Sequence, residues 1–320
     1  MLERKILITG YSGFVGSALL PHLSKSSLVL IGRQDVASSY KYDNFYLKKL
    51  NSSEQFGDCL DGVSVIVHCA ARVHIMNDKD KDPNLAFKEV NTLGTLNLAR
   101  QAAAAGVKRF IFISSIKVNG ESTSVYTPFR FNDDCHPQDP YGVSKSEAEI
   151  ELKKLTAETD MEVVIIRPTL VYGPGVKANF ASLMNLVSKG IPLPFGCITQ
   201  NKRSLVSVTN LVDLIITCID HPKAANQVFL VSDDHDVSTA EMVHEMAKAL
   251  DKPSIQLPIP IWCYKLAGKL FNKSDVVDRL TGSLQVDISH TKETLGWKPP
   301  QTLQEGFKQT AQAFLQAKTK

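Results

Sequence analysis

The chain has 320 residues, 43% of them hydrophobic and 22% charged, with six cysteines and a formal net charge of +3. Its lysines and arginines are scattered, it has no CxxC, HxxxH or HExxH spacing, and no run approaches the ~18 apolar residues of a membrane span. These features argue against a nucleic-acid-binding protein, a disulfide framework, a metal site and a transmembrane protein, and they favour a protein of the reducing cytoplasm.

Short apolar segments rich in β-branched residues recur through the first half of the chain. They predict strands buried on both faces at residues 5–9, 27–31, 63–71, 109–115 and 162–168. Helical stretches are predicted between them at 16–25, 91–106 and 144–159. This regular alternation predicts an α/β fold with a Rossmann-type, doubly wound parallel sheet.

The pattern becomes less regular after Pro168. Helices are predicted at 179–190, 208–221 and 238–250, and a further strand at 227–232. The apolar segment 257–271 could lie on a membrane surface, but it lacks a dense basic face, so we expect it to pack against a core. Together these elements predict a smaller, mixed α/β C-terminal lobe.

A glycine turn follows the first predicted strand. In TGYSGFVG, Gly10, Gly13 and Gly16 lead directly into a helix, and Phe14 and Val15 in the same turn are expected to contact the cofactor as well. Glycine permits the sharp turn and leaves backbone N–H groups open to a diphosphate at the helix N-terminus. We expect residues 1–172, together with part of 205–232, to form a dinucleotide-binding domain. We expect residues 173–320 to form a substrate-binding lobe.

The end of the second strand bears on which dinucleotide is bound. An acidic residue is expected there for NAD, but the chain has Gly32 and Arg33 in LIGRQD. A cation at this place can pair with the 2′-phosphate of NADP, although Asp35 could still serve as the acid and Arg33 could simply face solvent. The sequence therefore favours NADP over NAD.

The segment YGVSK places Tyr141 and Lys145 four residues apart near the start of a helix, on one face. A nearby ammonium favours the phenolate and lowers the pKa of a tyrosine. The pair is a candidate for proton transfer, although the same spacing also occurs on ordinary helix surfaces.

Several motifs occur in a characteristic order: TGYSGFVG, NTLGTLNL, FISSIKVNG, YGVSK, IIRPTLVYGPG and a late LGW. In this the chain resembles the extended short-chain dehydrogenase/reductase family, in its nucleotide-sugar epimerase/dehydratase branch. The resemblance implies that Tyr141 is the catalytic acid/base, that Lys145 holds the nicotinamide ribose, and that Ser115 hydrogen-bonds the reacting sugar oxygen.

The resemblance also assigns binding positions. On the cofactor side it implies Ala70, Ala71, Asn91 and Pro168, although Asn91 could instead cap the helix that follows it. On the substrate side it implies Lys117 beside Ser115, and Asn179, Arg203 and Arg279 at the diphosphate of a nucleotide sugar. An arginine fork suits a pair of diphosphate oxygens.

Departures from the family pattern narrow the expected reaction. Dehydratases of this branch carry an Asp-Glu pair after the Ser, whereas this chain has Ile116 and Lys117, and the tyrosine usual in the next motif is Asn119. We therefore disfavour a 4,6-dehydratase. We expect hydride transfer at C4 of a nucleotide-diphosphate hexose, UDP-linked, by a 4-epimerase or 4-ketoreductase of surface-polysaccharide biosynthesis.

Two further expectations rest on analogy with the family. The chain could be a non-catalytic dinucleotide sensor or scaffold of the same fold, although the intact Ser115, Tyr141 and Lys145 argue against it. A homodimer through the helices at 91–106 and 144–159 is also expected.

Overall fold

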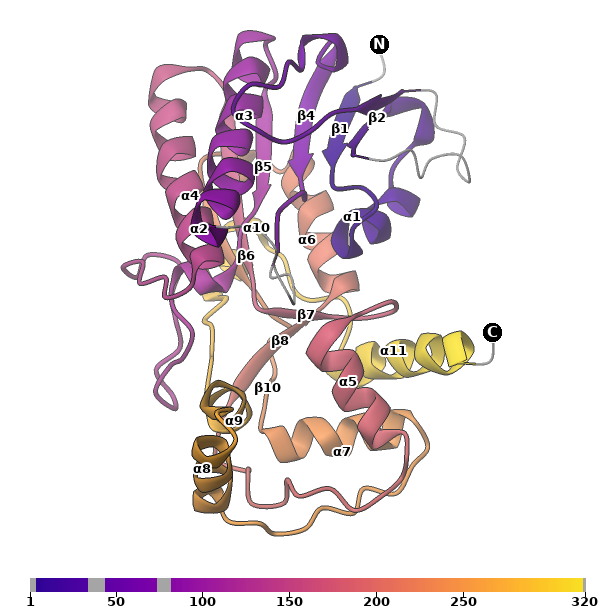
Figure 1. The fold of residues 1–320 in the computed structure, drawn as a ribbon. Helices are drawn as coiled ribbons and strands as arrows, with labels where there is room; N and C mark the ends of the chain where they lie inside the picture. Colours follow the sequence, from indigo (N-terminus) through magenta and orange to yellow (C-terminus); the bar gives the residue numbers. More distant parts are fainter. Residues whose placement is uncertain (1–3, 34–43, 74–81, 319–320) are drawn as a thin grey trace.

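The computed structural model describes residues 4–33, 44–73 and 82–318. Within them the chain forms a large parallel sheet flanked by helices, with a second, smaller lobe below it in Figure 1. The seven strands of the large sheet lie in the order β3 (Phe45–Leu47), β2 (Leu28–Gly32), β1 (Lys5–Thr9), β4 (Val63–His68), β5 (Arg109–Ile113), β6 (Glu162–Pro168) and β9 (Val228–Val231). All neighbouring pairs are parallel, so the predicted Rossmann-type sheet is confirmed.

Helices cover both faces of this sheet because its strands are apolar on both sides. Leu7 and Ile8, adjacent on β1, belong to opposite hydrophobic clusters. One face is covered by α1 (Phe14–Leu19) and α6 (Val208–Asp220). The other is covered by α3 (Thr95–Ala104) and α4 (Pro140–Glu158), and α2 (Pro83–Phe87) and the π-helical η5 (Lys88–Gly94) pack against α4. The two layers appear on opposite sides of the strands in Figure 1.

The smaller lobe has its own sheet and core. Its three strands lie in the order β10 (Asp236–Val237), β8 (Arg203–Ser207) and β7 (Leu170–Tyr172). The rings of Tyr172, Phe180 and Phe307 form an aromatic cluster at its centre. Its helices are α5 (Ala178–Val187), α7 (Thr239–Ala249), α8 (Ile261–Leu270), α9 (Ser274–Thr281) and α11 (Leu303–Lys318), while α10 (Ser289–Leu295) packs beside β9.

Short 3-10 turns connect several elements. They are η1 (Leu20–His22), η2 (Lys25–Ser27), η4 (Gly57–Cys59), η6 (Ile116–Val118) and η7 (Pro222–Ala224).

Two sequence expectations need correction. The helix expected to begin at residue 91 begins at Pro83, where Asp82 is the N-cap and accepts hydrogen bonds from the backbone of Asn84 and Leu85. Asn91 therefore lies inside a helix and does not cap one. The expectation that 257–271 packs against a core holds for one side of α8 only. Tyr264 packs against the lobe's core and Gly268 is buried, whereas Trp262, Leu266 and Leu270 are exposed.

Candidate active site

The candidate site lies where the carboxyl ends of β1, β4, β5 and β6 meet at one edge of the large sheet. The chain order runs outward in opposite directions from β1 and β4, since β2 and β3 lie on one side and β5 and β6 on the other. Such a reversal opens a crevice at the carboxyl ends of the strands, where ligands of doubly wound sheets bind.

The glycine turn has the geometry that a bound diphosphate needs. Gly10 has φ +68°, and a Cβ there would stand 2.6 Å from the backbone nitrogen of Ala70, so no other residue fits. The N–H of Gly13 donates to the carbonyl of Gly10 over 2.9 Å, and α1 begins at Gly13 without a side-chain cap. The first N–H groups of α1 are therefore available to an anion.

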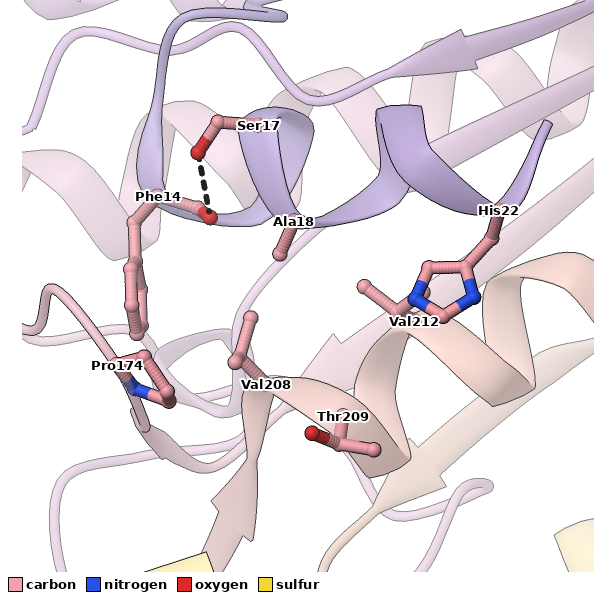
Figure 2. Close-up of a pocket in the computed structure, with 8 residues that line it drawn as sticks. All are labelled: Phe14, Ser17, Ala18, His22, Pro174, Val208, Thr209 and Val212. Carbon is pink, nitrogen blue, oxygen red and sulfur yellow. Dashed lines mark hydrogen bonds between the residues drawn. The ribbon is translucent and has the colours of Figure 1, made fainter. Parts of the chain in front are cut away.

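The other predicted cofactor residues lie on α1 and at the carboxyl ends of β4 and β6. Ala70 and Ala71 follow β4 and are half-buried, and Pro168 is buried at the end of β6. Val15 packs against the core beneath α1. The ring of Phe14 stands over Pro174 in a groove of about 270 Å³ between α1 and α6 (Figure 2), so the part of Phe14 suited to a diphosphate is its backbone.

Asn91 makes three hydrogen bonds to two neighbouring segments of the chain. Its side-chain oxygen accepts from the N–H of Arg72 over 2.7 Å, and its amide donates to the carbonyl of Arg72 and to the hydroxyl of Ser144 over 2.9 and 3.0 Å. Asn91 thus ties the segment after β4 to α4. It lies in the π-helical η5, a kind of distortion that is frequent at functional sites.

Tyr141 and Lys145 lie on α4, as predicted, but their protonation differs from the expectation. Lys145 is buried, its Nζ donates to the carbonyl of Ile113 over 2.8 Å and lies 6.0 Å from the centre of the Tyr141 ring. Burial lowers the pKa of Lys145 to about 7. Burial, followed by the charge of Asp139, raises the pKa of Tyr141 to about 12, so the predicted lowering by the ammonium is wrong in direction.

Ser115 lies at the end of β5, where it is half-buried and caps η6, accepting from the N–H of Lys117 over 3.2 Å. A Cβ on Gly142 would lie 2.9 Å from the carbonyl of Lys117, so glycine lets α4 begin against η6. This close approach brings Ser115, after β5, and the start of α4 with Tyr141 to the same carboxyl-end edge of the sheet.

Lys117 is engaged by two carboxylates. Its Nζ pairs with Asp139, and with Glu121 over 3.1 Å. Asp139 is also the N-cap of α4, accepting from the N–H of Gly142 over 2.7 Å. The Asp-Pro sequence at 139–140 is an N-cap signature that could have located Asp139 from the sequence.

Sequence reasoning missed a buried polar network beneath the catalytic edge. Arg167 and Glu149 form an ion pair that is almost completely enclosed, with 2.9 Å between Arg167 Nε and Glu149 Oε1. Ser114 donates to the same carboxylate, and Arg167 donates to Asn119 Oδ1 over 2.9 Å. Asn119, which departs from the family pattern, therefore completes a buried hydrogen-bond network.

A second buried group, His68, lies at the end of β4. Its two ring nitrogens are 2.8 Å from the hydroxyl of Thr9 and 2.9 Å from that of Thr95. Burial, and then the charge of Lys145, lower its pKa to about 3, so the imidazole is neutral. It joins β1, β4 and α3 directly behind the glycine turn.

The two arginines of the smaller lobe lie together. Arg203 donates to the carbonyls of Arg279 and Gly282 over 2.9 and 3.3 Å, while burial and the charge of Arg279 lower its pKa. Within the described ranges neither arginine has a carboxylate partner. Two adjacent guanidinium groups without a counter-charge suit a diphosphate.

The remaining predicted residues are at the surface. Asn179 is exposed in the first turn of α5. Arg33 is exposed directly after β2, and Asp35 lies outside the described residues.

Comparison with known proteins gives consistent results. The NAD dependent epimerase/dehydratase family matches residues 6–232. A UDP-glucose 4-epimerase of Vibrio cholerae is 67% identical over 319 residues, which is 99% of this chain and 97% of the relative.

Solved structures share the fold. A short-chain dehydrogenase/reductase superfamily protein of Agrobacterium tumefaciens with bound NAD superposes with a TM-score of 0.78 at 19% identity, over 99% of this chain and 98% of the other. The UDP-glucose 4-epimerase of Thermotoga maritima with UDP-glucose gives 0.75 at 20% identity, over 98% and 99%.

Proposed function

The chain belongs to the NAD-dependent epimerase/dehydratase family, and on that premise we propose that it catalyses 4-epimerisation of a UDP-linked hexose by hydride transfer at C4. The resemblance to the extended short-chain dehydrogenases is confirmed by the family match. The observation that carries the proposal is the 67% identity to a UDP-glucose 4-epimerase in a chain that places Ser115, Tyr141 and Lys145 at the edge of one crevice.

The crevice residues fit a dinucleotide. Gly10 and Gly13 leave the backbone open for a diphosphate, and the small side chains of Ala70 and Ala71 leave room beside β4. The nicotinamide, when bound, supplies the hydride acceptor and donor. Everything else in the reaction falls to side chains of this chain.

Tyr141 is proposed as the group that moves the proton of the sugar O4. Its raised pKa keeps the phenol protonated at neutral pH, the form that donates to a carbonyl oxygen, and the phenolate takes the proton in the opposite direction. Ser115, fixed by its bond from Lys117 N–H, is proposed to hydrogen-bond the same oxygen. Lys145, whose Nζ lies 6.0 Å from the centre of the Tyr141 ring, is proposed to hold the ribose of the dinucleotide.

The substrate diphosphate is proposed to bind to Arg203 and Arg279 of the smaller lobe, and Asn179 of α5 is proposed as a further ligand. Lys117 is proposed to contact the substrate as well, from beside Ser115. Ile116 is buried and apolar, and neither it nor Lys117 supplies the carboxylate that elimination of water requires, so dehydration stays disfavoured.

We propose NAD as the cofactor in place of the NADP that Arg33 suggests. The description of the family and the NAD in the Agrobacterium protein support NAD, whereas the exposed Arg33 supports NADP. Arg33→Ala should leave NAD binding nearly unchanged in a titration. A large loss of NADPH binding in that variant, with NAD bound weakly by both proteins, would restore the NADP assignment.

The domain and assembly expectations stay proposals. We propose that residues 1–172, with β9, hold the dinucleotide and that 173–320 hold the substrate. A homodimer in the cytoplasm through η5, α3 and α4 is supported by their exposed apolar residues Leu93, Val143 and Ile150.

The test is conversion between UDP-glucose and UDP-galactose without added cofactor, followed by nuclear magnetic resonance. Tyr141→Phe should retain bound NAD while turnover falls by at least ~10²-fold, and Tyr126→Phe, an exposed tyrosine, serves as the matched control. Consumption of NADPH with a 4-keto sugar, and no interconversion, would instead make the protein a ketoreductase. If the wild-type protein binds the cofactor but converts neither the UDP-hexoses nor the 4-keto sugar, the protein would instead be a non-catalytic sensor.

A further inference from the structure

Helix α8 exposes an apolar face that nothing in the proposed reaction uses. Trp262, Leu266 and Leu270 are 65%, 52% and 73% exposed, and Phe271, directly after the helix, is 75% exposed. The three helical residues are spaced four apart and therefore form one stripe. Large apolar side chains gathered in this way mark an interaction surface.

The helix is attached to the rest of the lobe by its opposite side. Gly268 packs against Val277 of α9, where a Cβ would stand 2.8 Å from a methyl group, and Tyr264 packs against the lobe's core. In Figure 1, α8 lies at the lower end of the molecule, far from α1 to α4. The apolar stripe is thus free along its length in the described structure.

The α8 segment itself carries charge of one sign. Residues 261–274 contain no Asp or Glu and three lysines, namely Lys265, Lys269 and Lys273. Helical spacing places Lys265 and Lys269 along one edge of the apolar stripe. The nearest acidic side chains in the sequence are Asp251, before the segment, and Asp275 and Asp278 on α9.

We propose that the α8 face, defined as Trp262, Leu266, Leu270 and Phe271, docks on the surface of an anionic lipid bilayer. A helix with Trp, Leu and Phe on one face and lysines along its edge is suited to lie in the headgroup region. The lysines reach anionic headgroups, each contributing ~1 kcal/mol near such a surface. Among the described helices none is long and apolar enough to cross a membrane, so the association is peripheral.

The charge pattern favours a bilayer over a second copy of the chain. In a two-fold symmetric contact the same patch meets itself, so the lysines of one copy would face those of the other. An anionic surface offers the opposite charge along the whole helix. Docking would also place α9, which packs on α8 and carries Arg279, close to the membrane.

The test is flotation of the full chain with vesicles of phosphatidylglycerol and phosphatidylcholine in equal parts, compared with phosphatidylcholine alone. The wild type should float with the anionic vesicles, and added salt should weaken this binding. Trp262 reports insertion by a blue shift of its emission, because the other tryptophan, Trp297, is buried and donates to Asp213 over 2.7 Å.

The double variant Leu270→Glu/Phe271→Glu should lose flotation while keeping turnover and its circular dichroism spectrum. Leu47→Glu, an equally exposed leucine on the edge strand of the large sheet, is the matched control and should float as the wild type does. The pair Lys265→Gln/Lys269→Gln should reduce the preference for anionic vesicles without removing the apolar face.

Three results would overturn the proposal. They are wild-type protein that does not float, binding that the double variant retains, and a wild-type oligomer that the double variant loses in sedimentation velocity. The last would assign the α8 face to a second copy of the chain.

Discussion

Arg167 on β6 and Lys145 on α4 are two buried cations, and their charges are compensated in different ways. Arg167 forms an ion pair with the carboxylate of Glu149 and donates a hydrogen bond to the side-chain oxygen of Asn119. Lys145 has a single backbone carbonyl, that of Ile113, and the face of the Phe112 ring 4.3 Å away. The first arrangement completes a structural network, whereas the second leaves a cation poorly compensated.

The difference arises from how α4 uses one carboxylate. Glu149 follows Lys145 by four residues and could pair with it along the helix. Instead it binds Arg167 of β6 and Ser114, which directly follows β5, and its charge only partly offsets the burial that lowers the pKa of Lys145. A buried ammonium kept from its nearest carboxylate is the arrangement that favours reactivity over stability.

Removal of Arg167, the structural cation of the two, should cause the largest change in stability. Arg167→Met leaves Glu149 buried and unpaired, and we expect it to lower the free energy of unfolding by ~3–5 kcal/mol. Urea unfolding followed by circular dichroism measures this change.

A second variant separates loss of the pair from loss of packing. Glu149→Leu/Arg167→Met removes both charges and should recover most of the lost stability, since apolar residues of similar volume replace buried pairs well. If the double variant is no more stable than Arg167→Met, the carboxylate is not the source of the loss.

Lys145, the cation of the candidate active site, should affect how stability depends on pH. The pKa of Lys145 is about 7 in the folded chain, against 10.5 as the ordinary value. Between these values the unfolded chain binds the proton more tightly, so stability rises with pH by up to about 1.4 kcal/mol per unit. Below about pH 7 Lys145 is protonated in both the folded and the unfolded chain, so the whole cost of burying its charge lowers the stability of the fold.

Lys145→Met should abolish this contribution. The difference in free energy of unfolding between wild type and variant, measured by urea at several pH values, should favour the variant most at low pH and shrink as pH rises above 7. Parallel curves would mean that the ammonium is not desolvated in the folded chain.

The large sheet could be predicted from the sequence because long apolar runs leave little choice. The strands at residues 5–9 and 162–168 have the predicted bounds, and the glycine turn lies where Gly10, Gly13 and Gly16 placed it. The strands β3 and β7 could not be predicted, because three residues are too few to show a hydrophobic periodicity. The early start of the helix at Pro83 was missed because Asp82 and Pro83 precede residues without an apolar pattern.

The site could be predicted as a set of residues, but its electrostatics could not. Spacing along α4 identified the face of Tyr141 and Lys145, yet it could not show that Glu149 binds Arg167, which comes from a strand beyond the end of the helix. The direction of the Tyr141 pKa depends on burial and on Asp139, and burial is not readable from a spacing.

The smallest expected effect is on the pKa of Tyr141, when the nearby charges of Asp139 and Lys117 are changed. The Asp139 carboxylate raises the pKa of Tyr141, and Lys117 pairs with that carboxylate. Lys117→Met should raise the pKa further, and Asp139→Asn should lower it while the amide oxygen still caps α4.

With a phenol that titrates near 12, the phenolate fraction and kcat/KM in the sugar-oxidising direction should rise with pH in the alkaline range. The Lys117→Met profile should run parallel to the wild type and below it, and the Asp139→Asn profile above it. Each displacement should stay within about tenfold, because a partly exposed ion pair contributes ~1 kcal/mol or less. Lys117→Arg keeps the charge and should follow the wild type, whereas loss confined to KM in Lys117→Met would assign this lysine to substrate binding alone.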